Sequence, residues 1–97
     1  MRELTEKEIE YIELCGRVGF SCNELAAVLS VPVADIEDQF RAGCGSVYEP
    51  WLKGRLQVEL ELRNAMLREA LNGSSPMMEK VLSIFRHTNE SINKLTY

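Results

Sequence analysis

The sequence predicts an all-α protein, in which an N-terminal three-helix helix-turn-helix precedes a long helix and a helical hairpin. Apolar residues recur three and four positions apart through most of the 97 residues, the spacing that places them on one face of a helix. Two capping-box patterns, beginning at Thr5 and Ser21, mark helix starts. A strand-like alternation from Leu56 to Leu62 is surrounded by strong helix formers, which favours a helix there as well.

Each of the first two helices is predicted to begin with a capping box. In this arrangement a Ser or Thr side chain and a Glu three residues later each accept a hydrogen bond from the other's backbone N–H. The two boxes predict helices over 6–17 and 22–29. The second helix is expected to end at Ser30, because Pro32 lacks an N–H and disfavours the α conformation in the residue before it.

Glycine and proline divide the rest of the chain. The apolar spacing predicts three further helices, over 33–42, 48–71 and 76–87. A linker is expected at Gly43 to Gly45, and Asn72-Gly73 is typical of a helix end. Residues 87–97 are polar, and we expect this segment to be frayed.

The segment from 22 to 41 fits the two-helix part of a helix-turn-helix. The motif needs a small residue where its helices cross, and Ala26 supplies it. Ser30 is the small residue of the tight turn, and Val31 and Ile36 are the apolar residues that hold the second helix on the first. Five side chains of the motif are therefore expected to be buried: Leu25, Ala26, Val31, Ile36 and Phe40.

The formal net charge of -4 is distributed unevenly. Residues 1–45 hold nine acidic and four basic side chains, a balance of -5. Residues 46–97 hold six acidic and seven basic side chains, a balance of +1. The first half therefore has the wrong sign for a domain that binds phosphates unaided.

The outward face of the third helix is acidic. It would present Asp35, Glu37 and Asp38, and its side chains of the base-reading kind are Gln39 and Arg41. Two interpretations stay open for this helix. It reads bases in the major groove of DNA, or it only packs on the other helices and is solvated.

Basic side chains gather on the fourth helix and after it, where Lys80 and Arg86 continue the series. Some of this charge is paired within the helix by residues four apart, so a solvated face is the alternative to a phosphate-binding one. The candidate DNA-binding residues are Arg41, Lys53, Arg55, Arg63 and Arg68. Because Asp35, Glu37 and Asp38 would face the phosphates of DNA, we expect weak, non-specific and strongly salt-dependent DNA binding by the single chain.

The fourth helix carries two apolar stripes. A chain of this length has too few other helices to cover both, so a homo-oligomer is expected. The candidate oligomer-interface residues are Trp51, Leu52, Leu56, Val58, Leu60 and Leu62. The chain then divides into a helix-turn-helix domain, 1–45, and a helical oligomerisation region, 46–97.

No catalytic set, metal site or cofactor motif is expected. Cys15, Cys22 and Cys44 lack metal-ligand spacing, and His87 is the only histidine. A Walker A motif is absent, which disfavours an enzyme. No apolar run is long enough to cross a bilayer and the first residues do not form a signal peptide, so a cytoplasmic protein without membrane contact is expected.

Several short motifs of the second half resemble those of phage terminase small subunits. They are Tyr48, then Gly54-Arg55-Leu56, then Leu62-Arg63-Asn64-Ala65, then the turn from Ala70 to Ser75 followed by Pro76-Met77-Met78. The resemblance covers about residues 5–85. It implies a non-enzymatic subunit that recognises viral DNA as a ring-forming oligomer in the host cytoplasm. That ring would pass the DNA to a large subunit carrying the ATPase and nuclease of genome packaging.

Two other functions are compatible with the same residues. One is a small protein-interaction adaptor that keeps the helix-turn-helix and does not read DNA, which the acidic third helix favours. The other is a dimeric transcription regulator. The mass in solution separates these possibilities, because the packaging function implies a ring and the regulator implies a dimer.

Overall fold

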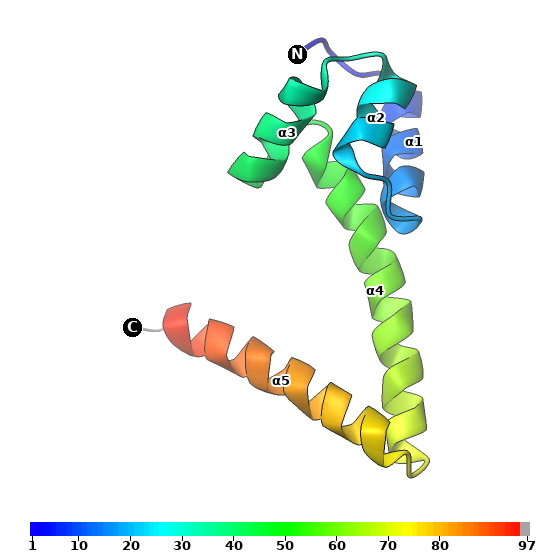
Figure 1. Ribbon diagram of the computed structural model, residues 1–97, viewed down its shortest axis with the longest axis vertical. Coiled ribbons are helices and arrows are strands. Elements are labelled where there is room, and N and C mark those ends of the chain that lie inside the picture. The colour runs from blue at the N-terminus through cyan, green and yellow to red at the C-terminus, as the bar shows by residue number, and fades with distance from the viewer. Residues whose placement is uncertain (96–97) are drawn as a thin grey trace. The chain divides into compact units, whose positions relative to one another are not determined.

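The computed structural model describes residues 1–95 and confirms the predicted all-α class. Within those residues there are five helices and no strand: α1 (Glu6–Arg17), α2 (Cys22–Leu29), α3 (Val33–Ala42), α4 (Tyr48–Leu71) and α5 (Ser75–Leu95) (Figure 1). The first four helices have the predicted bounds. In this part of the chain no helix is long and apolar enough to span a membrane.

The fifth helix is longer than the sequence predicted. α5 continues to Leu95, so the expected end near His87 and the frayed segment beyond it are wrong up to that point. Residues 96 and 97 of the segment lie outside the described residues. The cause is that no Gly or Pro follows Pro76, so nothing interrupts the backbone hydrogen bonds, and polar side chains are tolerated on an exposed helix.

The chain forms two compact units, Met1–Glu59 and Leu60–Tyr97. α4 contributes to both, with its residues up to Glu59 in the first unit. The first unit thus extends past residue 45, the predicted end of the helix-turn-helix domain. It does so because residues just before and within the first turns of α4 are part of its core.

Both predicted capping boxes are present. Thr5 and Glu8 exchange hydrogen bonds of 3.2 and 3.1 Å at the start of α1, and Ser21 and Glu24 exchange bonds of the same lengths at α2. The Arg2 guanidinium also binds both carboxylate oxygens of Glu8, at 3.0 and 2.7 Å. These bonds lower the pKa of Glu8 from 4.5 to about 2.

The turn between α2 and α3 follows from its residues. Ser30 takes the left-handed conformation with φ 55° and caps α2, and its N–H donates to the carbonyl of Ala26. Pro32 then starts α3, and α2 packs on both α1 and α3.

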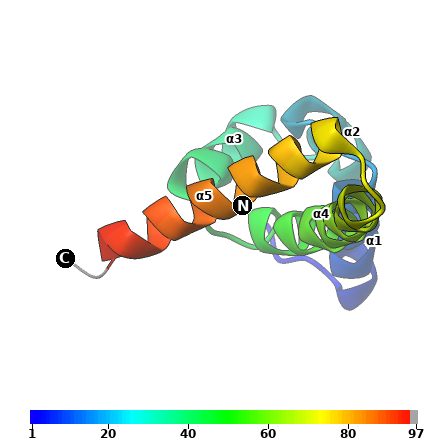
Figure 2. The ribbon, with the colours of Figure 1, turned by 90° about the horizontal axis from the view of Figure 1, so that it is seen from below.

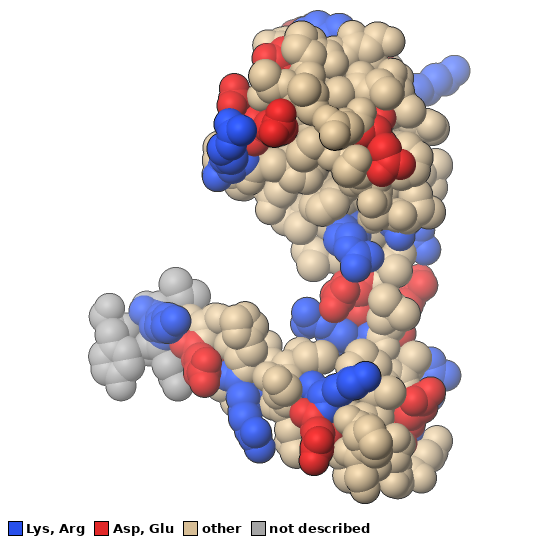
Figure 3. Space-filling model, in the orientation of Figure 1, with Lys and Arg blue, Asp and Glu red and all other residues tan. Residues whose placement is uncertain are grey.

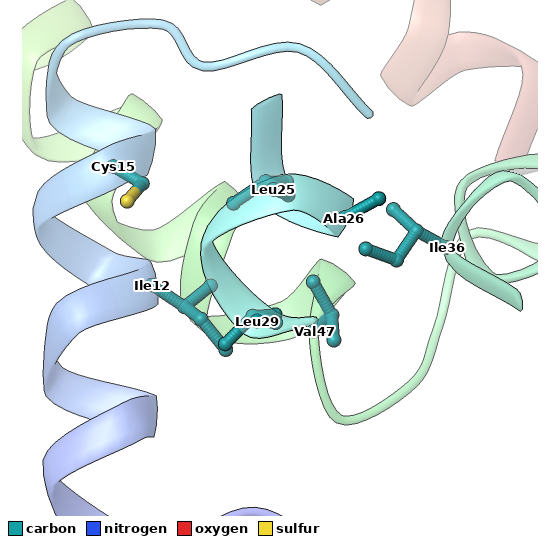
Figure 4. Close-up of a cluster of buried hydrophobic side chains, with 7 residues drawn as sticks. All are labelled: Ile12, Cys15, Leu25, Ala26, Leu29, Ile36 and Val47. Carbon is teal, nitrogen blue, oxygen red and sulfur yellow. The ribbon is translucent and has the colours of Figure 1, made fainter. Parts of the chain in front are cut away.

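The core of the first unit lies among α1, α2 and α3 and the residue just before α4 (Figure 4). Its buried side chains are Ile12, Cys15, Leu25, Ala26, Leu29, Ile36 and Val47. Of the five predicted core residues, Leu25, Ala26 and Ile36 are buried as expected. Val31 and Phe40 are only half-buried, because Val31 lies in the turn and Phe40 packs at the edge of the core against the Trp51 and Tyr48 rings.

α1 and α4 cross at two glycines. A Cβ added to Gly16 would overlap the carbonyl oxygen of Trp51, and one added to Gly54 would overlap the carbonyl oxygen of Glu13. The two backbones are therefore in direct contact. A side chain at either position would force the helices apart.

The second unit consists of the end of α4, a turn at Asn72–Ser74 and α5. Gly73 takes φ +100° in this turn. The buried apolar residues of the second unit are Ala70 in α4 and Val81 in α5. From the turn, α5 runs away from the last turns of α4, so the two helices meet near the turn and separate beyond it (Figures 1 and 2).

Candidate nucleic-acid interface

The outward face of α3 is acidic, as its sequence indicates. Asp38 and Arg41 are exposed, and Asp35 and Glu37 are half-exposed. The guanidinium of Arg41 lies 3.0 Å from an Asp38 carboxylate oxygen and 3.7 Å from one of Glu37. Over the end of α3, Figure 3 shows basic and acidic side chains in contact. The charge of Arg41 is thus largely balanced within its own helix.

Gln39 serves the fold and does not point outward as a base reader. Its side-chain oxygen accepts hydrogen bonds from the N–H groups of Val47 and Tyr48, at 2.8 and 3.1 Å. These bonds occupy backbone donors at the start of α4. Sequence reasoning missed this role because nothing in the local pattern connects a glutamine of α3 with a helix start eight or nine residues later.

Lys53 and Arg55, two of the candidate DNA-binding residues, also lie next to carboxylates. The Lys53 ammonium lies 3.8 Å from Glu13 of α1, and the Arg55 guanidinium lies 3.7 Å from Glu59, one helical turn on. Exposed pairs of this kind contribute little to stability. They do lower the positive potential that a phosphate would meet at this surface.

Arg63 and Arg68, the other two candidates, belong to the second unit, and both are exposed. Arg63 also lines a groove between α4 and α5. In the same unit Lys80 and Arg86 are exposed on α5. None of Arg68, Lys80 and Arg86 forms an ion pair within residues 1–95, and Figure 3 shows basic side chains along both helices of this unit.

The candidate oligomer-interface residues fall into two groups. Trp51 lies inside the first unit, where its indole N–H donates to the carbonyl of Phe20 at 2.9 Å and its ring lies 4.8 Å from that of Phe40. Leu52 and Val58 are half-buried. The exposed group consists of Leu56, Leu60 and Leu62, each more than half exposed.

The cysteines and the histidine do not converge. Cys15 is buried, Cys22 is half-buried, and Cys44 and His87 are exposed. Burial raises the pKa of the Cys15 thiol, and Glu24 adds to that effect. Among the residues that the structure describes, no group of three or more His, Cys, Asp or Glu side chains is placed to hold a metal ion.

Comparison of the chain with models of protein families, with curated proteins and with solved structures finds no match.

Proposed function

We propose that this protein is a non-enzymatic DNA-binding subunit that works as an oligomer, and that its second unit makes most of the DNA contacts. The observation that carries the proposal is the difference between the three candidate cations of the first unit and three exposed cations of the second. Arg41, Lys53 and Arg55 of the first unit lie 3.0–3.8 Å from carboxylate oxygens. Arg68, Lys80 and Arg86 of the second unit are exposed and form no ion pair within residues 1–95.

This difference affects the affinity for phosphate. A cation next to a carboxylate has to lose part of that attraction before it can release a counterion by binding DNA. A cation without a carboxylate partner loses no such attraction when it binds a phosphate. The net charge points the same way, because the second unit, 60–97, has five basic and four acidic side chains, whereas 1–59 has six basic and eleven acidic.

The topology of α1–α3 supports a role in handling DNA. Three short helices, with a tight turn between the second and the third, are the elements of a helix-turn-helix. In this proposal α3 does not read bases, because Gln39 is engaged with α4 and Arg41 with Asp38.

The most specific form of the proposal follows from the resemblance to terminase small subunits. The DNA is then a viral genome, the oligomer acts in the cytoplasm of the host cell, and the protein partner is a large subunit that carries the ATPase and nuclease.

The test is a salt titration of binding to a duplex. The variant Arg68→Ala/Lys80→Ala/Arg86→Ala should lower the slope of log affinity against log salt by about two to three, since each phosphate contact contributes about one unit. The matched control Arg41→Ala/Lys53→Ala/Arg55→Ala also removes three cations. Its slope should change by less than about one unit. Equal effects of the two variants, or a larger effect of the control, would contradict the assignment to the second unit.

A protein-interaction adaptor is the second candidate, because three carboxylates and one guanidinium on α3 give it a negative face. A wild-type chain that does not bind duplex at about 50 mM salt, where electrostatic binding is strong, would favour the adaptor. The variant Asp35→Asn/Asp38→Asn adds a check. It should bind DNA at least as tightly as wild type, and weaker binding would identify α3 as a base-reading helix.

A further inference from the structure

α5 carries a mostly apolar seam that the second unit covers only in part. Met78, Val81, Phe85, Thr88 and Ile92 recur at alternating spacings of three and four, the a and d positions of a heptad repeat. Val81 is buried against the end of α4, whereas 51% of Phe85 and 52% of Ile92 remain exposed. The seam therefore continues past the region in which the chain supplies its own packing partner.

Two apolar grooves between α4 and α5 flank this seam. One, of about 380 Å³, is lined by Leu67, Ala70, Leu71, Met78, Val81, Leu82 and Phe85. The other, of about 230 Å³, shares Leu67, Val81 and Phe85 with it and includes Arg63 and Thr88. The first groove lies toward the turn end of α5, and the second lies beside the middle of the helix. The exposed Ile92 lies at the far end of the same helix.

From these features we infer that two copies of this chain pair through α5, antiparallel and about a two-fold axis near Phe85. In this arrangement the Ile92 end of each α5 covers the groove beside Met78 in the other copy. The pairing goes beyond the proposed function, because it places the contact between copies on α5, whereas the sequence placed it on α4. It is compatible with a DNA-binding oligomer of two copies and not with the ring that the resemblance to terminase small subunits implies. It stands on the apolar seam and does not depend on DNA binding.

The exposed apolar area of the second unit is about as large as the apolar area that a stable dimer interface buries. The side chains concerned are Leu71, Met78, Leu82, Phe85 and Ile92, which are 77%, 41%, 48%, 51% and 52% exposed. At roughly 200 Å² for a large residue, they present on the order of 500 Å². A specific interface of standard size buries about 800 Å² per partner. At the roughly 65% apolar share of homodimer interfaces, this also amounts to about 500 Å² of apolar area.

The charges of α5 favour a second copy as the occupant. All five of its acidic and basic residues fall on the b, c and f positions, away from the seam: Glu79, Lys80, Arg86, Glu90 and Lys94. Two seams of this kind meet without placing a charged residue of α5 between them. A single self-complementary face closes under a two-fold axis, and an antiparallel arrangement brings the far end of one helix to the groove of the other.

Sedimentation of the wild-type chain and two variants tests the pairing. Wild type should have the mass of two copies at micromolar concentration. Phe85→Glu and Ile92→Glu should each raise the dissociation constant at least about 100-fold, because each dimer carries the change twice and a buried anchor is worth about tenfold or more. Ser83→Glu is the matched control, since it adds the same charge at an f position of α5 and should leave the dimer intact.

Circular dichroism of the Ile92→Glu variant should keep the wild-type helical signal, which separates loss of pairing from unfolding. A monomeric wild type, an assembly of more than two copies, or a dimer that both Glu variants leave unchanged would overturn the inference. A ring of copies would overturn the inferred pairing and leave the proposed function unaffected. Conversely, a dimer that does not bind DNA would contradict that function and leave the pairing intact.

Cross-linking tests the antiparallel orientation. In a background with Cys22→Ser and Cys44→Ser, a bis-maleimide of about 10 Å should join Met78→Cys chains to Ile92→Cys chains. The two Ile92 positions lie seven residues from the axis, so they are about 21 Å apart in this arrangement. Efficient cross-linking of Ile92→Cys chains to each other would overturn it.

Discussion

Replacing Gly54 by Ala probes the closest approach between two helices of the first unit. Gly54 is buried against α1, and a Cβ there would overlap the carbonyl oxygen of Glu13 and lie 2.8 Å from its carbonyl carbon. Carbon atoms in contact lie about 3.5–4.0 Å apart, so the helices would have to separate by about 0.7 Å or more at this point. Because the atoms of Glu13 concerned belong to the backbone, no side-chain rotation can relieve the overlap.

The separation would also strain the bridge that Gln57 makes between the helices. Gln57 donates to Glu13 at 2.8 Å and accepts from Arg17 at 2.9 Å. Overpacking costs about 1–3 kcal/mol, and each lost hydrogen bond costs about 0.5–1.5 kcal/mol. The higher helix propensity of Ala returns up to about 1 kcal/mol. The free energy of unfolding should therefore fall by about 2–4 kcal/mol, a large part of the stability of a small unit.

Urea unfolding followed by circular dichroism measures this loss. Ala27→Gly, on the exposed side of α2, is the control for helix propensity alone and should cost about 1 kcal/mol. Gly16→Ala, which would overlap the carbonyl oxygen of Trp51, should behave like Gly54→Ala. A Gly54→Ala chain as stable as wild type would show that α1 and α4 do not meet at this glycine.

Three further predictions concern single side chains of the first unit. The pKa of Glu8 is lowered to about 2 by Arg2, so its stabilising effect is present above its ordinary value and lost as the pH falls through the folded value. Wild type should therefore be more stable than Glu8→Gln at pH 6, and urea unfolding should show the gap closing between about pH 4.5 and pH 2; a constant gap would refute this. Cys15 is buried with a raised pKa and Cys44 is exposed, so a thiol reagent should modify Cys44 in the folded chain well before Cys15, and equal rates would refute the burial. Gln39→Ala should lower the free energy of unfolding by about 1–2 kcal/mol, since two N–H groups lose their acceptor, whereas Gln39→Glu should retain most of the stability; equal losses in the two variants would argue against the cap.

Local patterns determined the helices. The capping boxes at Thr5 and Ser21, the stop at Pro32 and the glycine-containing turn at Asn72–Ser74 all act within four or five residues. The hydrogen bonds that start or end a helix join near neighbours in sequence, so the residues themselves carry the information. The largest error in a boundary, at the end of α5, lies where no such local signal exists.

Part of the candidate site followed from the sequence in the same way. The acidic face of α3 depends on residues of one helix, and so does the exposure of Leu56, Leu60 and Leu62 on α4. Trp51, a candidate for the same oligomer surface, packs its ring against Phe40 of its own chain. A stripe of apolar residues does not reveal whether its own chain or another chain covers it.

The tertiary structure alone decided which distant residues meet. It buries Val47, which belonged to no predicted element, among three helices. It places the side-chain oxygen of Gln39 within hydrogen-bonding distance of the backbone at the start of α4. It also pairs Lys53 with Glu13 and brings α1 into contact with α4 at Gly16 and Gly54. These contacts join residues 8 to 41 positions apart, and each exists because the buried core brings separate helices together. No periodicity within one helix contains that information, so the pairing of a side chain across helices has to be found in three dimensions.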